Sequence, residues 1–578
     1  MKEIIIGIDL GTTNSEVALV KDGKVEVLEI KKGTQQLPSY VGFNDQGDLL
    51  VGETARNQYL IYPERTVKSV KRHMGEDSQL LLAEKQYTPQ ELSAMILRHL
   101  KQVAEKETGQ TIRRAVITVP AFFSDAQRQA TRDAGEIAGL TVERIINEPT
   151  AAALAYEVDN SRARTILVYD LGGGTFDVSV VKMERNVVEV LSSHGDNQLG
   201  GDDFDEKIIA HILQHLEKEY GTEANTDVRA MSRITRAAED AKIALSTQPY
   251  YTIEEEHLLE HKGSPVHLSL ELAREEYEEM IAPYIDQTMQ AVHTALDGAG
   301  LRVADIDEIL LVGGSTKTPL VRDRLEQDLR LQVRLEIDPD LCVASGAAIQ
   351  AGMIGGEEVS AVLVDVTPYT FGTSALGELN GNFYPECYVP IIKKNTPIPV
   401  TRSESFFATH DGQDKVKVKV FQGENEDAME NKTMGSFMIE GLKNVKEGDA
   451  IIATFSLDIN GILHVTGMEK KTGKKESLRI DNAISRFQEE ELEQAKQHID
   501  TLFSDDDSSE SSNDQDTAAP DPALIDKARN LRDALEGDDK EDISEVIEDL
   551  EQAVTTGDAI KIQQATEELS DLIYYLET

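Results

Sequence analysis

Two copies of one strand-turn-strand pattern constrain the fold of this chain more than any other feature. The first copy is an apolar strand that ends in Asp9-Leu10-Gly11-Thr12-Thr13 and leads into a second strand at residues 17–20. The second copy starts at Ile166, passes through Asp170-Leu171-Gly172-Gly173-Gly174-Thr175 and leads into a strand at residues 177–181. The repetition predicts two related lobes that face each other.

Both turns have the chemistry of a polyphosphate site. Glycine lets backbone N–H groups approach a phosphate without a Cβ in the way, and the threonines add hydroxyl donors. Asp9 and Asp170 would repel a polyphosphate unless a hard cation lay between them, and hydrated magnesium suits that role. A helical P-loop is the competing arrangement, but Gly-x-x-x-x-Gly-Lys-Ser/Thr is absent and each turn leads into a strand. The other alternative is that both turns are ordinary glycine hairpins without a ligand. That interpretation is favoured for one such turn alone, but not for two copies together.

Composition narrows the classes of partner. The 578 residues allow several domains, and 40% of them are hydrophobic. The chain has 58 basic and 105 acidic side chains, and its net charge of −47 argues against nucleic acid and anionic membranes. Cys342 and Cys387 cannot form a disulfide framework and fit a reducing compartment. Because Met1-Lys2-Glu3 leads directly into a strand and no apolar run reaches membrane length, we expect a soluble, cytoplasmic protein without a signal peptide.

The region from residue 1 to 356 alternates short apolar strands with amphipathic helices, which is typical of an α/β domain. Strands are expected at residues 115–119 and 309–312. Helices are expected to begin after Thr88 and after Ser124, the second with a capping box to Gln127.

The pattern changes to strands alone from about residue 365 to 482, which predicts a β-sandwich. Residues 415–420 alternate strictly, and residues 453–465 predict a hairpin with an Asn-Gly turn. A helix follows and is expected to stop at Ser504, where an acidic, serine-rich stretch is too polar to fold. Helical spacing resumes over residues 523–575.

Four segments, in this order along the chain, carry a resemblance to a known family. They are Ile8-Asp9-Leu10-Gly11-Thr12-Thr13-Asn14-Ser15, Ile145-Ile146-Asn147-Glu148-Pro149-Thr150-Ala151-Ala152-Ala153, Asp170-Leu171-Gly172-Gly173-Gly174-Thr175-Phe176-Asp177 and Leu311-Val312-Gly313-Gly314-Ser315-Thr316. The set resembles the signatures of the seventy-kilodalton heat-shock (DnaK-like) chaperones, and the resemblance extends through nearly the whole chain. The chain looks most similar to the shorter, divergent bacterial branch exemplified by HscC, because residues 390–396 follow an extended hairpin region.

The resemblance implies a multidomain protein. Its parts would be an actin-like, two-lobed α/β ATPase domain (1–356), a linker (357–364), a β-sandwich peptide-binding domain (365–483), the start of an α-helical lid (484–503), an acidic disordered insert (504–522) and a C-terminal helical bundle (523–578). The insert predicts a looser lid and faster peptide exchange. The linker would dock on the ATPase domain in one nucleotide state, and its small Ala361 and Val362 predict weak docking.

The family's functional residues can be carried over to matching positions. Asp9 and Asp170 would hold Mg²⁺ through waters, Lys71 would stabilise the transferring phosphoryl group or orient the attacking water, and Glu148 and Thr175 would lie beside them. Further contacts to ATP or ADP would come from Gly11, Thr12, Thr13, Gly172, Gly173, Gly174, Gly200, Gly201, Glu239, Lys242, Ser246, Gly313, Gly314, Ser315, Lys317 and Asp340. Without the resemblance, Lys71 indicates a solvated basic cluster, and Glu239 with Lys242 a helical ion pair. Lys317 replaces the usual arginine and stacks less well on adenine, which predicts weaker nucleotide binding.

The resemblance also implies a site that holds an extended peptide by main-chain hydrogen bonds and one apolar pocket. The pocket would be built from Phe371, Thr373, Phe406, Val416 and Val418, with Leu376 and Thr409 arching over the peptide. The two threonines predict a specificity that differs from that of the general housekeeping chaperone. For each phenylalanine and valine, packing in the sandwich core is the alternative.

These implications predict an ATP-driven chaperone that binds unfolded or extended peptide clients and takes part in protein folding and the stress response. A J-domain co-chaperone is implied, with Arg144 and Asn147 at matching positions, and a nucleotide exchange factor is an optional partner. A sugar kinase or an actin-like filament protein would have no reason for the second half of the chain. A passive holdase or exchange factor would have no need of Lys71, Glu148, Asp170 and Thr175.

Overall fold

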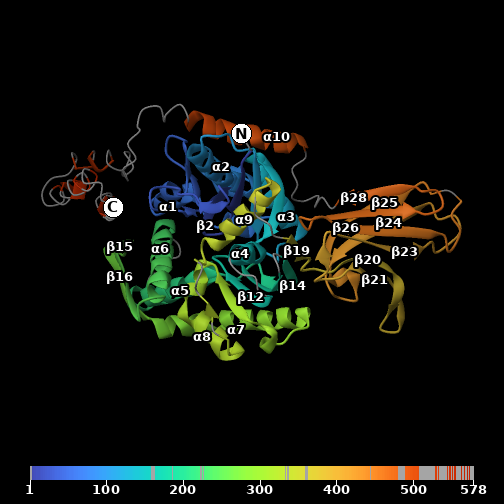
Figure 1. Ribbon diagram of the computed structural model, residues 1–578. Helices are drawn as coiled ribbons and strands as arrows, with labels where there is room; N and C mark the ends of the chain where they lie inside the picture. The colour runs from blue at the N-terminus through green and yellow to red at the C-terminus, as the bar shows by residue number, and fades with distance from the viewer. Residues whose placement is uncertain are drawn as a thin grey trace.

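The structure is a computed structural model that describes most of the chain. The described residues are 3–157, 163–184, 187–221, 224, 227–331, 333–334, 338–357, 362–442, 444–479, 489–506 and separate positions between 527 and 572. Within them, two mixed sheets covered by helices lie beside a pair of antiparallel sheets (Figure 1).

The two glycine turns lie in two sheets of matching topology. The first sheet has the order β11 (Thr141–Asn147), β10 (Arg114–Val119), β1 (Ile5–Asp9), β2 (Asn14–Lys21) and β3 (Lys24–Val27). The second has the order β18 (Val333–Arg334), β17 (Glu308–Val312), β12 (Arg164–Leu171), β13 (Phe176–Glu184) and β14 (Val187–Asp196). In each sheet the strand that carries the motif aspartate near its end pairs antiparallel with the next strand and parallel with a distant one. The match confirms the prediction of two related lobes.

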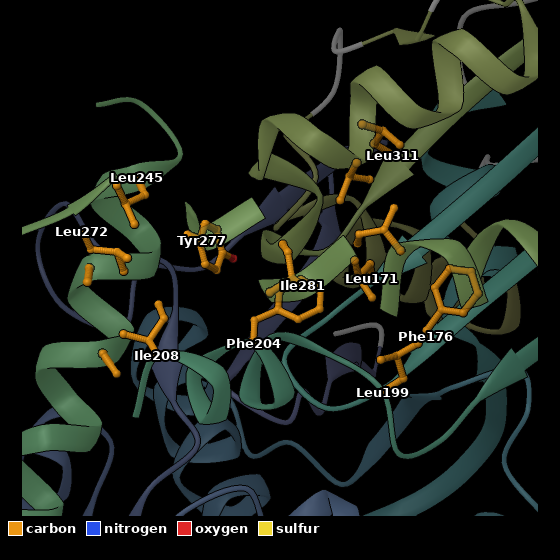
Figure 2. Packing of buried hydrophobic residues seen from close by; sticks show 14 of the residues in the cluster. Leu171, Phe176, Leu199, Phe204, Ile208, Leu245, Leu272, Tyr277, Ile281 and Leu311 are labelled. Atoms are coloured by element: carbon orange, nitrogen blue, oxygen red, sulfur yellow. The ribbon is translucent and has the colours of Figure 1, made fainter. Parts of the chain in front are cut away.

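Helices cover both faces of these sheets, and for that reason β1 and β12 are continuous apolar runs. The helices are α2 (Pro89–Thr108) and α3 (Asp125–Ile137) in the first lobe, and α5 (Gly201–Tyr220), α6 (Val228–Leu245), α7 (Arg274–Ala299) and α8 (Pro319–Leu329) in the second. The predicted capping box is present at Ser124, and the predicted cap Thr88 forms a capping box as well. In the second lobe, Leu171 and Phe176 of the sheet pack toward Phe204 of α5 and Ile281 of α7 (Figure 2).

Shorter elements complete the lobes. They are β4 (Leu37–Pro38), β5 (Val41–Phe43), β6 (Leu49–Val51), α1 (Glu53–Tyr59), β7 (Thr66–Val67), β8 (Leu80–Leu82) and β9 (Lys85–Tyr87) in the first lobe, and β15 (Tyr250–His261) with β16 (Ser264–Ala273) in the second.

Two helices rich in small residues join the lobes. Helix α9 (Cys342–Ile354) contacts β1 and β2, helix α4 (Glu148–Glu157) contacts β12 and β13, and the helices contact each other. A Cβ added at Gly346 would lie 1.8 Å from the carbonyl oxygen of Ala151, so the crossing requires glycine.

The second half of the chain forms two antiparallel four-stranded sheets. Their orders are β21 (Asn382–Ile392), β20 (Phe371–Leu379), β24 (Lys415–Gln422), β25 (Lys432–Glu440) and, in the other sheet, β23 (Val400–Phe407), β26 (Ala450–Leu457), β27 (Leu463–Glu469), β28 (Lys475–Arg479). Both sheets contribute to one apolar cluster that includes Phe371, Val420 and Phe455. The predicted hairpin is present, but it turns through the five residues 458–462 instead of a two-residue Asn-Gly turn. That longer loop reaches the first lobe, as described below.

Strand β19 (Val362–Val366) connects the two halves. It extends the second lobe's sheet by pairing parallel to β14, and it pairs antiparallel with β22 (Pro397–Ile398). The preceding linker residues 358–361 lie outside the described residues.

The helix after the sheets lies on the first lobe. Helix α10 (Glu489–Asp506) contacts α2 and α3 and extends past Ser504, so the predicted stop is two residues too early. Figure 1 shows α10 beside α2 and away from the paired sheets. The predicted insert beyond Asp506 lies outside the described residues, while described positions from 528 to 569, Ile543 and Leu550 among them, share a buried cluster. Among the described residues, no helix is long and apolar enough to span a membrane.

Candidate functional site

The two predicted phosphate turns meet face to face. A Cβ added at Gly173 would lie 1.9 Å from Thr13 Oγ1, and one added at Gly174 would lie 2.7 Å from Thr12 Cγ2. Gly200 lies against the same turn, because a Cβ added there would lie 2.5 Å from the Gly173 carbonyl carbon. Backbone from both lobes therefore forms one cradle, and side chains at these glycines would fill it.

Asp9 and Asp170 end the two strands that lead into this cradle. Asp9 Oδ1 accepts a hydrogen bond from Thr118 Oγ1 at 2.6 Å. Asp170 is 6% exposed, and its Oδ2 has no hydrogen-bond partner among the described residues. Burial raises the pKa of both carboxyl groups, and the nearby Glu148 carboxylate raises that of Asp170 further. The half-buried Asp9 and the buried Asp170, with its orphaned oxygen, fit a hard divalent cation held partly through waters.

Lys71 and Glu148 form a buried ion pair beside these carboxylates. Lys71 lies on a 3-10 turn (Val70–His73), Glu148 begins α4, and Nζ lies 2.5 Å from Oε1. Burial lowers the pKa of Lys71, but the carboxylates of Glu148 and Asp9 outweigh it and the net shift is upward. Burial raises the pKa of Glu148 to about 7, against the opposite effect of Lys71. The structure thus places Lys71 inside the site. Its sequence surroundings alone had indicated a solvated face, and that interpretation is wrong.

The residues predicted to contact the nucleoside lie on α6 and pair with its neighbours. Lys242 Nζ pairs with Asp205 Oδ2 at 2.7 Å and donates to the Gly201 carbonyl at 3.2 Å. Ser246 caps the end of α6, one turn beyond Lys242. Glu239 pairs with Arg56 of the first lobe at 3.5 Å, which bridges the lobes.

The third glycine turn borders the second. Ser315 Oγ donates to the Gly172 carbonyl at 2.8 Å, and Gly313 takes a positive φ of 83° that favours glycine. Lys317 Nζ donates to Asp340 Oδ2 at 2.6 Å. Its ammonium is therefore engaged by a carboxylate, which supports the expectation that it stacks less well on an adenine than arginine would.

The sequence motifs missed several residues that close the cleft. Asp177 is buried and accepts backbone N–H groups of Ala121 and Phe122, each at 3.0 Å. Further lobe-to-lobe bonds join Ser69 to Asp202 at 2.8 Å and Arg72 to Asp203 at 3.1 Å. Asp177 is the last residue of the motif that begins at Asp170, and it could have been singled out from the sequence. The other pairs join residues more than 130 positions apart, so no local pattern indicates them.

The residues predicted for a peptide pocket do not gather in one place. Phe371 and Phe406 pack in the core between the two sheets, whereas Val418 and Val416 belong to a separate cluster. Thr373 is buried and donates to the Lys419 carbonyl at 2.6 Å. Leu376 and Thr409 are exposed. Phe371 and Val418 are therefore core residues, and they belong to two separate clusters. The core divides because β20 pairs with β24 only at Phe371 and Gly372.

A hydrogen-bonded interface joins the first lobe to strand β19 and to the paired sheets. Asn147 Nδ2 donates to Asp365 Oδ2 at 2.7 Å, and the Ile145 amide donates to Asn460 Oδ1 at 3.0 Å. The amide of Leu463 donates to Asp125 Oδ1 at 2.8 Å. Arg144, which donates to Gln350 Oε1 at 2.9 Å, and Asn147 are both buried. The two positions predicted for a J-domain partner thus lie within the molecule in this arrangement.

The fold defines a two-lobed α/β protein with a glycine-rich cradle between its lobes. The description "Hsp70 protein" belongs to the family model that matches residues 5–81 and 77–578. Because these matches cover nearly the whole chain, the protein belongs to the Hsp70 family. Members of this family are ATP-dependent chaperones that bind ATP or ADP with Mg²⁺, and they generally bind peptide clients and J-domain co-chaperones.

Proposed function

We propose that this protein is an ATPase that couples hydrolysis in the cleft between its lobes to binding and release of apolar, extended peptide segments. The observation that carries the proposal is the buried Lys71–Glu148 pair beside Asp9 and Asp170, under two glycine turns. A passive relative would have no use for a buried lysine whose charge is set by three neighbouring carboxylates.

Each residue of the cleft has a distinct task in this proposal. Mg²⁺, when bound by Asp9 and Asp170, supplies positive charge that offsets the phosphates. The Lys71 ammonium stabilises negative charge on the transferring phosphoryl group, and Glu148 orients the attacking water. The backbone of the two glycine turns and the Thr175 hydroxyl hold the phosphates in place.

The described arrangement supports a mechanism for coupling. Strand β19 is docked on β14, and Asn147 beside the catalytic Glu148 holds Asp365 of that strand. Helix α10 lies on the first lobe, away from the paired sheets. We propose that this is the open, ATP-bound state, and that hydrolysis releases β19 and lets the lid close over the peptide site. Val362 is 58% exposed, so little apolar area holds the docked state.

The same proposal covers the division of the chain and its partners. The paired sheets from residue 365 to 483 would be the peptide-binding domain, and residues 484–503 and 523–578 the lid with its acidic insert. A J-domain protein would act through Arg144 and Asn147 by loosening the interface that buries them. Membership of the HscC-like branch, a cytoplasmic location, a role in stress and an exchange factor belong to the proposal as well.

Single-turnover ATP hydrolysis with and without an apolar peptide tests the proposal. Wild type, Asp170→Asn and the exposed control Asp297→Asn would be compared. We expect slow hydrolysis that the peptide accelerates in wild type and in the control, and that is lost in Asp170→Asn. Hydrolysis that ignores the peptide would mean an uncoupled ATPase, and nucleotide binding without hydrolysis would mean a passive holdase.

A further inference from the structure

Two buried serines hold the first glycine turn and have no role in the mechanism above. Ser39 Oγ donates a hydrogen bond to the Gly11 carbonyl at 2.9 Å, and the Gly11 N–H donates to Ser15 Oγ at 3.2 Å. The two hydroxyl oxygens lie 2.9 Å apart, and both serines are buried. Together these contacts close a ring of hydrogen bonds on one residue of the turn.

The direction of each hydrogen bond in this ring follows from the number of protons. A serine hydroxyl has one proton to donate and can accept as well. Because the Ser39 proton goes to the Gly11 carbonyl, the bond between the two hydroxyls runs from Ser15 to Ser39. Ser15 in turn accepts from the Gly11 N–H. Every donor in the ring therefore has an acceptor, and hydrogen bonds linked in this way strengthen one another.

Ser39 also holds a second carbonyl of the same turn. Its backbone N–H donates to the Thr13 carbonyl at 2.8 Å. The residues before it form β4, which pairs with the start of β2 directly after the turn. Ser39 therefore clamps the turn on both sides of Thr12, once through its hydroxyl and once through its backbone.

This clamp sets the direction of the Thr12 N–H. The Gly11 carbonyl and the Thr12 N–H belong to one planar, trans peptide, so they point in opposite directions. With the carbonyl held by Ser39, the N–H points away from the clamp. Thr12 is buried, and none of the described residues accepts a hydrogen bond from its N–H.

Thr12 also lies against the second glycine turn, because a Cβ added at Gly174 would lie 2.7 Å from Thr12 Cγ2. A buried backbone donor normally has a partner. The unpartnered Thr12 N–H, between the two turns, therefore fits an acceptor that enters the cradle.

We propose that Ser39 is a positioning residue for the phosphates of the nucleotide. Its hydroxyl fixes the Gly11 carbonyl and thereby orients the Thr12 N–H to donate to a phosphate oxygen. The inference rests on the proposed nucleotide site and assigns part of its phosphate affinity to a residue that does not touch the ligand. A donor oriented before the ligand binds has no reorganisation cost on binding.

ADP and adenosine form a matched pair of ligands for the test, because adenosine has no phosphate. Binding of each to the full chain would be measured by calorimetry in the presence of Mg²⁺. We expect Ser39→Ala to weaken ADP binding about tenfold, the order for one hydrogen bond to a charged group, and to leave adenosine binding unchanged. Thr131→Val removes a buried hydroxyl from α3 of the same lobe and should bind both ligands like wild type.

A second variant separates the clamp from the stability of the ring. Ser15→Ala opens the ring but keeps the bond from Ser39 to the Gly11 carbonyl, so its loss of ADP affinity should be smaller than that of Ser39→Ala. The inference is overturned if Ser39→Ala leaves ADP binding unchanged or weakens ADP and adenosine equally. A larger ADP loss in Ser15→Ala than in Ser39→Ala would overturn it as well.

A measurement on wild type tests the same inference even where Ser39→Ala does not fold. Amide hydrogen exchange at Thr12 should slow when ADP binds and not when adenosine binds. Unchanged exchange at Thr12 with ADP bound would overturn the inference. Absence of ADP binding in wild type would instead overturn the proposed function.

Discussion

Lys71 is the residue whose role depends most on its neighbours. Its sequence surroundings, with Lys68 and Arg72 nearby, indicate a solvated basic face. In the fold it is buried against Glu148 and within the field of Asp9 and Asp170. The residue pattern around Lys71 cannot indicate this burial and pairing, because the three carboxylates come from β1, β12 and α4, far away in the chain.

Replacement of Lys71 by methionine should abolish hydrolysis while ADP still binds. The methionine keeps the side-chain volume but removes the ammonium that stabilises charge in the transition state, so we expect a loss of about 10²–10³-fold in the single-turnover rate. Lys85→Met, which changes an exposed lysine of the same lobe, should hydrolyse ATP like wild type. An active Lys71→Met protein with unchanged rate would contradict the assigned role.

Asp205 makes the stability of the second lobe depend on pH. Burial raises its pKa from 3.8 to about 7 despite its ion pair with Lys242. Between these two values the folded chain keeps a proton that the unfolded chain releases, so this group contributes stability at low pH that is lost as the pH rises toward 7. Above pH 7 its contribution no longer changes.

Urea unfolding of the nucleotide-free protein at pH 5 and pH 8 checks this expectation. Asp205→Asn stays neutral, so its loss of stability between the two pH values should be smaller than that of wild type. Asp297→Asn, at an exposed position, should follow wild type. If Asp205→Asn and wild type lose the same stability, the carboxyl group is not protonated in the folded state at pH 5.

At the scale of elements, the strands and helices of the lobes follow from local pattern. The cap at Thr88 and the capping box at Ser124 lie where predicted, because capping involves residues three positions apart. The end of α10 and the loop at residues 458–462 differ from expectation. Both make or flank contacts with the first lobe, and such tertiary contacts override local preference for a stop or a tight turn.

Helix α10 should detach from the first lobe when its apolar anchor is shortened. Ile499 and Phe503 are buried in the lobe's core, and His498 stacks on Tyr87 with ring centroids 5.9 Å apart. Phe503→Ala removes a buried ring, a change that typically costs about 3–5 kcal/mol in a core. We expect faster amide hydrogen exchange along α10 with unchanged exchange in β12.

The matched control for this experiment is Gln494→Ala on the exposed face of the same helix. It keeps helix propensity high and removes no buried contact, so exchange along α10 should match wild type. Equal protection of α10 in Phe503→Ala and wild type would mean that packing on the lobe does not hold the helix.

At the scale of the whole molecule, a few polar contacts hold the paired sheets to the first lobe. Asn460 accepts from the amide of Ile145, 315 positions earlier in the chain, and Tyr369 donates its hydroxyl proton to the Phe122 carbonyl. Asn460→Ala would leave the Ile145 amide buried without a partner, at a cost of about 1–3 kcal/mol. That is enough to shift a docking equilibrium severalfold.

Small-angle scattering of the ATP-bound, hydrolysis-deficient Lys71→Met protein should therefore show a larger radius of gyration after Asn460→Ala. Asn382→Ala, in the exposed turn region of the β20–β21 hairpin, should leave the radius unchanged. An unchanged radius in both would mean that other contacts dominate the interface.

Features that depend on neighbours within a few positions could be predicted from the residues alone: the two glycine turns, their aspartates, the strand and helix periods, the caps and the acidic balance. Together with the four ordered motifs, these were sufficient for the family. The fold was needed to show that Lys71 pairs with Glu148, that Phe371 and Val418 pack in separate cores, and that α10 lies on the first lobe. Such contacts depend on how distant surfaces fit, and neither residue of a pair carries a local signal of its partner.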